Sequence, residues 1–124
     1  MTGSLTTALA LGSLLVLVPS SGMALTMEDC ARWLQQLRGE ASGVQIGGDT
    51  ARDNRRDMLE NLDKAAVPGD SKDTADALRN VDEFRKRAAR LTSEGKVGKD
   101  AGKRLDTLSD TYRHCVEAVK SKQQ

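Results

Sequence analysis

The stretch that decides the fold runs from Val97 to Val119 and reads VGKDAGKRLDTLSDTYRHCVEAV. Its apolar residues recur at steps of three and four, so they share one face of a helix that turns ~100° per residue. That face consists of Val97, Ala101, Leu105, Leu108, Tyr112, Cys115 and Val119. We expect this helix, residues 97–120, to form one wall of the core and to carry a covalent tether at Cys115.

A first helix is predicted over residues 27–38. Thr26 and Asp29 have the spacing of a capping box, in which each side chain accepts a hydrogen bond from the other's backbone amide. The expected inner face consists of Met27, Cys30, Leu34 and Leu37. We expect Gly39 to end the helix, because four glycines between residues 39 and 49 favour a loop.

A second helix is predicted over residues 51–66. Thr50 and Asp53 provide another capping-box candidate at its start. Pro68 is expected to stop it, because proline cannot continue the hydrogen bonds of a helix.

A third helix is predicted over residues 72–93, with Ser71 as its cap and Gly95 just beyond its end, where a left-handed backbone favours glycine. The short connection over 93–98 makes the last two helices antiparallel neighbours. Four amphipathic segments without a strand pattern predict an all-α fold, an up-down-up-down antiparallel four-helix bundle.

Composition fits one small helical domain. The chain has 124 residues, of which 2% are aromatic and 30% are charged, with a net charge of +1. Leu, Val, Ala and Met must therefore build the core, which suits closely packed helices better than a β-sandwich or barrel. Because the charges balance, we do not expect a nucleic-acid partner.

The first 24 residues predict a secretory signal peptide. They contain no charged residue and hold a nearly unbroken apolar run from Ala8 to Val18, followed by small residues at Gly22 and Ala24. The run is shorter than the ~20 residues that a membrane span needs. We expect residues 25–124 to form an exported domain, periplasmic or secreted, without a transmembrane span. The alternative is an uncleaved interfacial anchor.

Cys30 and Cys115 are the only cysteines, and each lies at the centre of an apolar stripe. In an oxidising compartment they predict a disulfide between the first and last helices. The alternative is a reactive thiol. Cys-x-x-Cys is absent, and adjacent helical residues point ~100° apart, so His114 is poorly placed to act as a base for Cys115.

A basic cluster spans the third and fourth predicted helices. It indicates contact with an anionic surface, such as lipid headgroups, a cell-wall polymer or an acidic protein. The alternative is a solvated face needed only for solubility. The cluster consists of Arg85, Lys86, Arg87, Arg90, Lys96, Lys99, Lys103 and Arg104.

No catalytic constellation stands out. His114 is the only histidine and is expected to face outward, no pair of acids has the arrangement of an acid/base couple, and no metal-ligand spacing is present. We therefore expect a protein that is not an enzyme and that holds no metal.

The chain resembles the small periplasmic b-type cytochromes of the cytochrome b-562 family. The residues that carry the resemblance are Leu25–Asp29, which are similar to that family's mature start, Leu91–Val97, which are similar to its last interhelical turn, and Thr111–His114, which are similar to its haem-ligand region. The resemblance covers about a third of the chain, and it implies a four-helix bundle.

The resemblance also implies a haem held by a methionine of the first helix and a histidine of the last. Transferring those positions lands on Ala31 and Cys115, while Met27 and His114 lie nearby as shifted candidates. Our principal interpretation is therefore an exported, disulfide-tied bundle without catalytic activity or cofactor, which binds a protein or an anionic envelope component. The alternative is a haem-binding cytochrome in periplasmic electron transfer.

Overall fold

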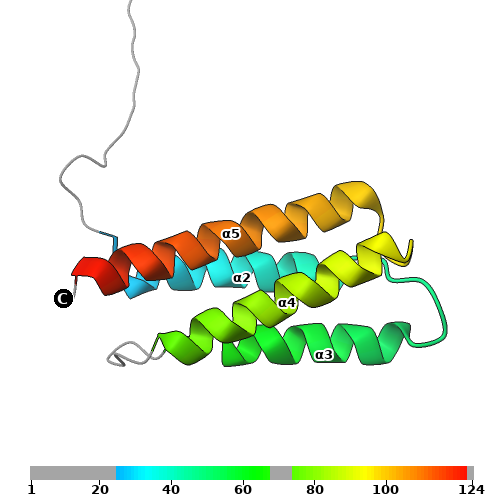
Figure 1. The fold of residues 1–124 in the computed structure, drawn as a ribbon, viewed down its shortest axis with the longest axis horizontal. Coiled ribbons are helices and arrows are strands. Elements are labelled where there is room, and N and C mark those ends of the chain that lie inside the picture. Colours follow the sequence, from blue (N-terminus) through cyan, green and yellow to red (C-terminus); the bar gives the residue numbers. More distant parts are fainter. Residues whose placement is uncertain (1–24, 68–73, 123–124) are drawn as a thin grey trace, which may run out of the picture.

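The computed structural model describes residues 25–67 and 74–122, which form four packed helices (Figure 1). These are α2 (Met27–Gly43), α3 (Ala51–Lys64), α4 (Ala75–Ser93) and α5 (Lys99–Lys122). Successive helices run in opposite directions and pack in chain order, and α5 closes the ring by packing against α2. The predicted all-α, up-down-up-down bundle is confirmed.

The predicted signal peptide, residues 1–24, lies outside the described residues. Within the described ranges, no helix combines the length and apolar character that crossing a membrane requires.

The predicted capping box at the start of α2 is confirmed. The Thr26 backbone N–H donates to Asp29 Oδ2 at 2.9 Å, and the Asp29 N–H donates to Thr26 Oγ1 at 3.3 Å. The backbone hydrogen bond from Thr26 holds the pKa of the Asp29 carboxyl below its ordinary value. The first turn of α2 is thus defined by residues that are visible in the sequence.

The predicted end of this helix at Arg38 is wrong, because α2 continues through Gly39 to Gly43. Glycine inside a helix costs about 1 kcal/mol relative to alanine. Burial of Ala41 and Val44 beyond Gly39 offsets this cost.

An arginine from α3 also stabilises the end of α2. The Arg55 guanidinium donates to the carbonyl oxygens of Ala41 at 2.9 Å, Ser42 at 2.6 Å and Val44 at 2.6 Å. These are carbonyls that a helix end leaves without partners. The short connection to α3 therefore begins at Val44, later than predicted.

The second predicted capping box is wrong. Thr50 precedes α3 but its side chain makes no capping hydrogen bond; it accepts one from Asn54 Nδ2 at 3.1 Å. Asp53 instead lies 3.3 Å from Arg56 in an ion pair. The residue types fit a capping box, but the side chains satisfy one another along the helix surface.

The C-terminus of α3 is tied to α5 by a tyrosine. The helix ends at Lys64, two residues before the predicted end, and the Ala65 N–H turns back to Leu62 O at 3.1 Å. The Tyr112 hydroxyl, which is buried, donates to the Ala65 carbonyl oxygen. This bond spans the bundle and fixes where α3 stops.

The end of α4 follows the prediction. Gly95 has φ +77°, and the amides of Gly95 and Lys96 donate to Thr92 O at 3.0 Å and Leu91 O at 2.9 Å. This is the Schellman arrangement, which needs a left-handed residue where glycine stands. The helix begins at Ala75, later than the predicted residue 72, and the predicted cap Ser71 lies outside the described residues.

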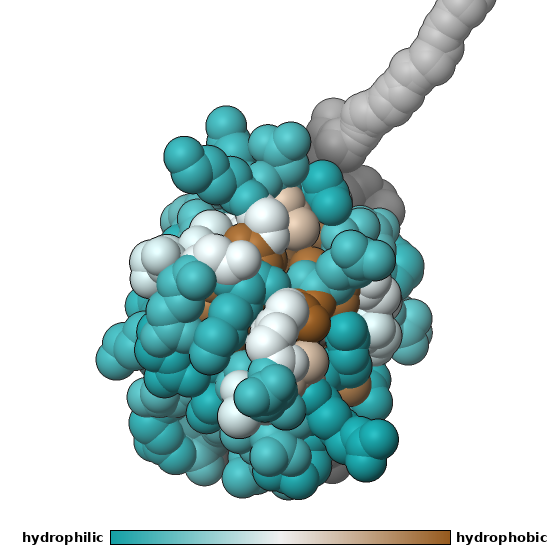
Figure 2. Space-filling model, turned by 90° about the vertical axis from the view of Figure 1, so that its right-hand side faces the viewer, coloured by the Kyte–Doolittle hydropathy of each residue, from teal (hydrophilic) through white to brown (hydrophobic). Residues whose placement is uncertain are grey.

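The turn after α4 also contacts the α2–α3 loop, since Gly47 N–H donates to Lys96 O at 2.8 Å. Figure 2 views the molecule from this end, where hydrophilic residues surround a small central area of apolar and intermediate ones. The two connections at this end of the bundle are therefore held together.

The core contains side chains from all four helices and follows the predicted stripe of α5, with Leu105, Tyr112 and Cys115 buried. The helix begins at Lys99, two residues after the predicted start, so Val97 is buried in the turn before it. Val116 and Ser109 are buried as well, although the spacing did not predict them. The fully buried large side chains include Leu37, Met58, Leu62, Val81, Phe84 and Leu91.

Helices α4 and α5 approach closely at Gly102. A Cβ atom on Gly102 would stand 2.3 Å from Thr92 Oγ1, whereas one on Gly39 in α2 would meet no atom within 4 Å. The two glycines therefore have opposite expected responses to the same substitution.

We predict that Gly102→Ala lowers the free energy of unfolding by about 1–3 kcal/mol, because the overlap with Thr92 outweighs the gain in helix propensity. Gly39→Ala should raise it by about 0.5–1 kcal/mol, because only the propensity term acts. Urea denaturation of the two variants measures both changes. Stabilisation by both variants would contradict the close approach of α4 to α5.

We predict that Tyr112 titrates late and that stability falls at alkaline pH. Burial raises the pKa of the Tyr112 phenol to about 12, from an ordinary value of 10.0. The protonated phenol therefore makes its full contribution to the free energy of unfolding below pH 10, and this contribution is lost as pH rises toward 12. Since Tyr112 is the only tyrosine, near-ultraviolet tyrosinate absorbance measures its titration directly.

Tyr112→Phe is the matched control. At neutral pH its free energy of unfolding should be about 1–2 kcal/mol lower than that of the parent, because the hydrogen bond to the Ala65 carbonyl is missing. Between pH 10 and 12 its free energy of unfolding should fall less than that of the parent. A tyrosinate titration centred at the ordinary value in the folded protein would contradict this account.

Candidate functional site

The structure joins Cys30 of α2 to Cys115 of α5 in a disulfide, as the sequence analysis expects. Their Cα atoms are 5.5 Å apart, within the usual range for a disulfide, and both side chains are buried. The bond connects residues that are 85 positions apart. It fixes the start of the first helix to the last helix of the bundle.

Half of the predicted basic cluster forms ion pairs with carboxylates. Such pairs reduce the positive charge that this part of the surface offers to a partner. The pairs are Arg85 with Asp106 at 3.0 Å, Arg87 with Asp57 at 3.5 Å, Lys96 with Glu94 at 3.5 Å and Arg104 with Glu40 at 3.3 Å.

The other half lies on α4 and the start of α5. Lys86, Arg90, Lys99 and Lys103 are exposed, and none forms an ion pair with a residue in the described ranges. Each helix carries two of them four positions apart, on one side of the helix. The predicted eight-residue cluster therefore separates into a paired set and these four residues, which we call the free cations.

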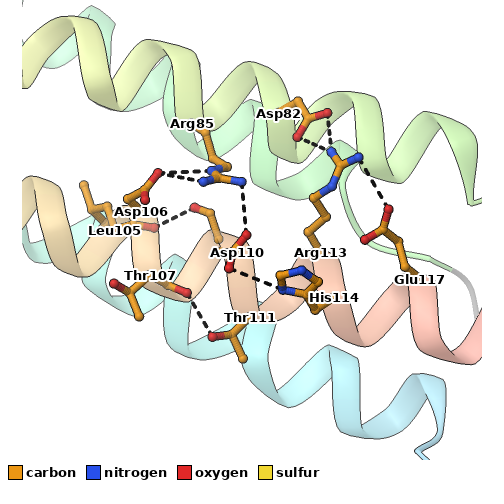
Figure 3. Close-up of polar contacts among 11 residues, drawn as sticks. Asp82, Arg85, Leu105, Asp106, Thr107, Asp110, Thr111, Arg113, His114 and Glu117 are labelled. Atoms are coloured by element: carbon orange, nitrogen blue, oxygen red, sulfur yellow. Dashed lines mark hydrogen bonds and ion pairs between the residues drawn. The ribbon is translucent and has the colours of Figure 1, made fainter.

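A polar network joins α4 to α5 (Figure 3). Arg85 donates from Nη2 to Asp106 Oδ1 at 3.0 Å and from Nη1 to Asp110 Oδ1 at 3.4 Å. The other oxygen of Asp110 lies 3.3 Å from His114 Nδ1. This network occupies two carboxylates of α5 and the single histidine.

A second arginine connects the same two helices. Arg113 contacts both carboxylate oxygens of Asp82 and lies 3.5 Å from Glu117 (Figure 3). Hydrogen bonding to Asp82 raises the pKa of the Arg113 guanidinium above its ordinary value. The sequence did not predict this pair, because its members are 31 positions apart and only the packing of α4 against α5 brings them together.

The two candidate haem ligands differ in their surroundings. Met27 packs against the core beside Cys30, where it lines a cavity of about 40 Å³ with Leu34 and Tyr112. The side chain of His114 is 70% exposed and contacts Asp110. The cavity is far smaller than the ~300–1,000 Å³ of typical ligand sites.

Among the residues that the structure describes, no three His, Cys, Asp or Glu side chains form a group that could hold a metal ion. A surface groove of about 630 Å³ lies between the end of α2 and the start of α5. The Glu40–Arg104 ion pair lies in its lining and joins its two helices. We find no arrangement of nucleophile, base and orienting group in these surfaces.

The chain matches no known protein-family model, no curated protein and no solved structure. The resemblance to the small b-type cytochromes therefore remains a prediction from sequence.

We predict that replacing both cysteines by serine lowers the free energy of unfolding by roughly 4 kcal/mol, because the unfolded chain regains the freedom of a long loop. Urea denaturation measures the loss. The parent chain, purified from an oxidising compartment, should have an intact mass two protons below the reduced value. A reduced mass, or equal stability of parent and variant, would contradict a stabilising disulfide.

Proposed function

We propose that the protein is a non-catalytic, disulfide-tied helical bundle that binds an anionic partner outside the cytoplasm. One observation supports this most directly: the free cations Lys86, Arg90, Lys99 and Lys103 are exposed without ion-pair partners in the described ranges, while neighbouring arginines are paired. An acidic protein or an anionic envelope component is the class of partner that this surface would attract.

Fixed spacing strengthens the proposal. The free cations lie on two helices that are held together by Arg85, Arg113 and the close contact at Gly102. Charges carried on a fixed helical backbone lose less backbone freedom on binding than those of a flexible basic segment would. The net charge of the whole chain, +1, does not reveal this array, because acidic residues elsewhere balance its positive charge.

The predicted leader and the disulfide support a location outside the cytoplasm. Disulfides persist in oxidising compartments and are rare where thiols are kept reduced. The pattern of residues 1–24 is typical of a signal peptide. These two features suit a periplasmic or secreted binding protein better than a cytoplasmic one.

The haem alternative rests on the resemblance alone. It needs Met27 and His114 to reach one iron atom, yet Met27 packs against the core and His114 is largely exposed. No contact in the described residues favours it over binding through the free cations, so we do not propose it.

The test compares two variants that each remove three positive charges. Arg90→Gln, Lys99→Gln and Lys103→Gln remove free cations of the α4–α5 surface. Arg52→Gln, Lys64→Gln and Lys120→Gln remove exposed bases that also lack an ion-pair partner among the described residues. Binding to immobilised heparin, a soluble polyanion probe, is measured for both at several salt concentrations.

We expect the α4–α5 variant to elute at clearly lower salt than the parent, and the control variant to elute close to the parent. Exposed charges are screened over ~8 Å at physiological ionic strength, so the difference should shrink as salt rises. Equal losses in the two variants would show that only total charge matters and would overturn the proposal.

A further inference from the structure

A shallow furrow runs between α4 and α5 on the surface that carries the free cations. Its volume is about 390 Å³, and small side chains line it: Ala88, Ala89, Thr92, Ser93 and Gly102. The volume lies near the lower end of that of known ligand sites, ~300–1,000 Å³. The furrow exists because no large apolar side chain from either helix fills the seam.

The free cations border this furrow on both helices. Lys99 lines it directly, and Lys103 is four positions further along the same side of α5. On α4, Lys86 lies three positions before Ala89, and Arg90 lies three positions before Ser93, so both are neighbours of furrow residues on the helix surface. Positive charge therefore flanks the furrow along both helices.

The one carboxylate that lines the furrow, Asp106, is already paired with Arg85 at 3.0 Å. An approaching anion therefore meets Lys99 and, beside it, three further cations without ion-pair partners in the described ranges. Against these four charges stand the exposed acids Glu83 and Asp100 on the same two helices, since Asp106 is paired with Arg85. This charge arrangement favours a negatively charged occupant.

We propose that the furrow binds an acidic amphipathic helical segment of a partner protein, with apolar side chains on the furrow floor and carboxylates against the free cations. This inference rests on the proposed function and names its partner. A flat layer of anionic headgroups would meet the flanking cations but leave the floor unfilled. A helix with an apolar stripe and acidic flanks satisfies both parts of the surface.

The experiment uses two synthetic peptides of equal net charge. One is a helical peptide with Leu on one face and Glu beside it, and the other is a polyglutamate peptide without apolar residues. Isothermal titration calorimetry measures the binding of both to the oxidised, full-length chain. We expect the amphipathic peptide to bind at least tenfold more tightly, because it alone buries apolar surface in the furrow.

Ala89→Leu fills the furrow without changing charge. Because Ala89 is exposed, the variant should fold, and the thermal unfolding midpoint checks this. It should lower the affinity for the amphipathic peptide about tenfold to a hundredfold, which is the factor that burying one large apolar side chain provides. Ala75→Leu, at another exposed alanine of α4 outside the furrow, is the matched control and should bind as the parent does.

Two results would overturn the furrow proposal: equal affinity for the two peptides, or equal binding of the amphipathic peptide by the parent and Ala89→Leu. If the parent and Ala89→Leu both bind phosphatidylglycerol vesicles and both peptides bind weakly, the partner is a lipid surface, and the furrow proposal is likewise overturned. Retention on heparin that still depends on Arg90, Lys99 and Lys103 would leave the broader anionic-partner proposal standing in each case.

Discussion

The bond between Cys30 and Cys115 is the constraint on which the bundle depends. It joins α2 to α5, the two helices that must meet for the ring of four to close, and both sulfur atoms are buried in that seam. With one Trp, one Tyr and one Phe in the chain, the core has few large side chains with which to hold itself together. A domain of about 100 residues with a modest core gains a large share of its stability from one such link.

The side of α5 that faces α4 is held by close packing and ion pairs, which also determine the charge of the nearby surface. Gly102 allows α4 to approach closely, while Arg85 and Arg113 reach across to carboxylates of the neighbouring helix. Surface ion pairs contribute little stability individually, up to about 1 kcal/mol. Their larger effect here is on charge, because they occupy Asp82, Asp106 and Asp110 at the seam, while the free cations beside it have no ion-pair partner in the described ranges.

Sequence reasoning succeeded at several features that a local rule sets, although the same capping-box rule failed at Thr50 and Asp53. The capping box of Thr26 and Asp29, the left-handed Gly95 and the apolar stripe of α5 all depend on residues a few positions apart. It failed at Gly39 because tertiary burial and the Arg55 cap outweighed the glycine penalty. The same limit applied to the basic cluster, whose members could be located but not sorted into paired and free, since Arg85 and Arg104 find partners 21 and 64 positions away.

The most direct test of this account is a map of where the amphipathic acidic peptide contacts the oxidised protein, obtained from backbone amide chemical shifts. The account predicts that the largest changes fall within residues 85–93 and 99–106, on both sides of the furrow. Changes centred on the exposed apolar residues Leu25 and Trp33 would contradict it, and so would changes spread evenly over all basic residues.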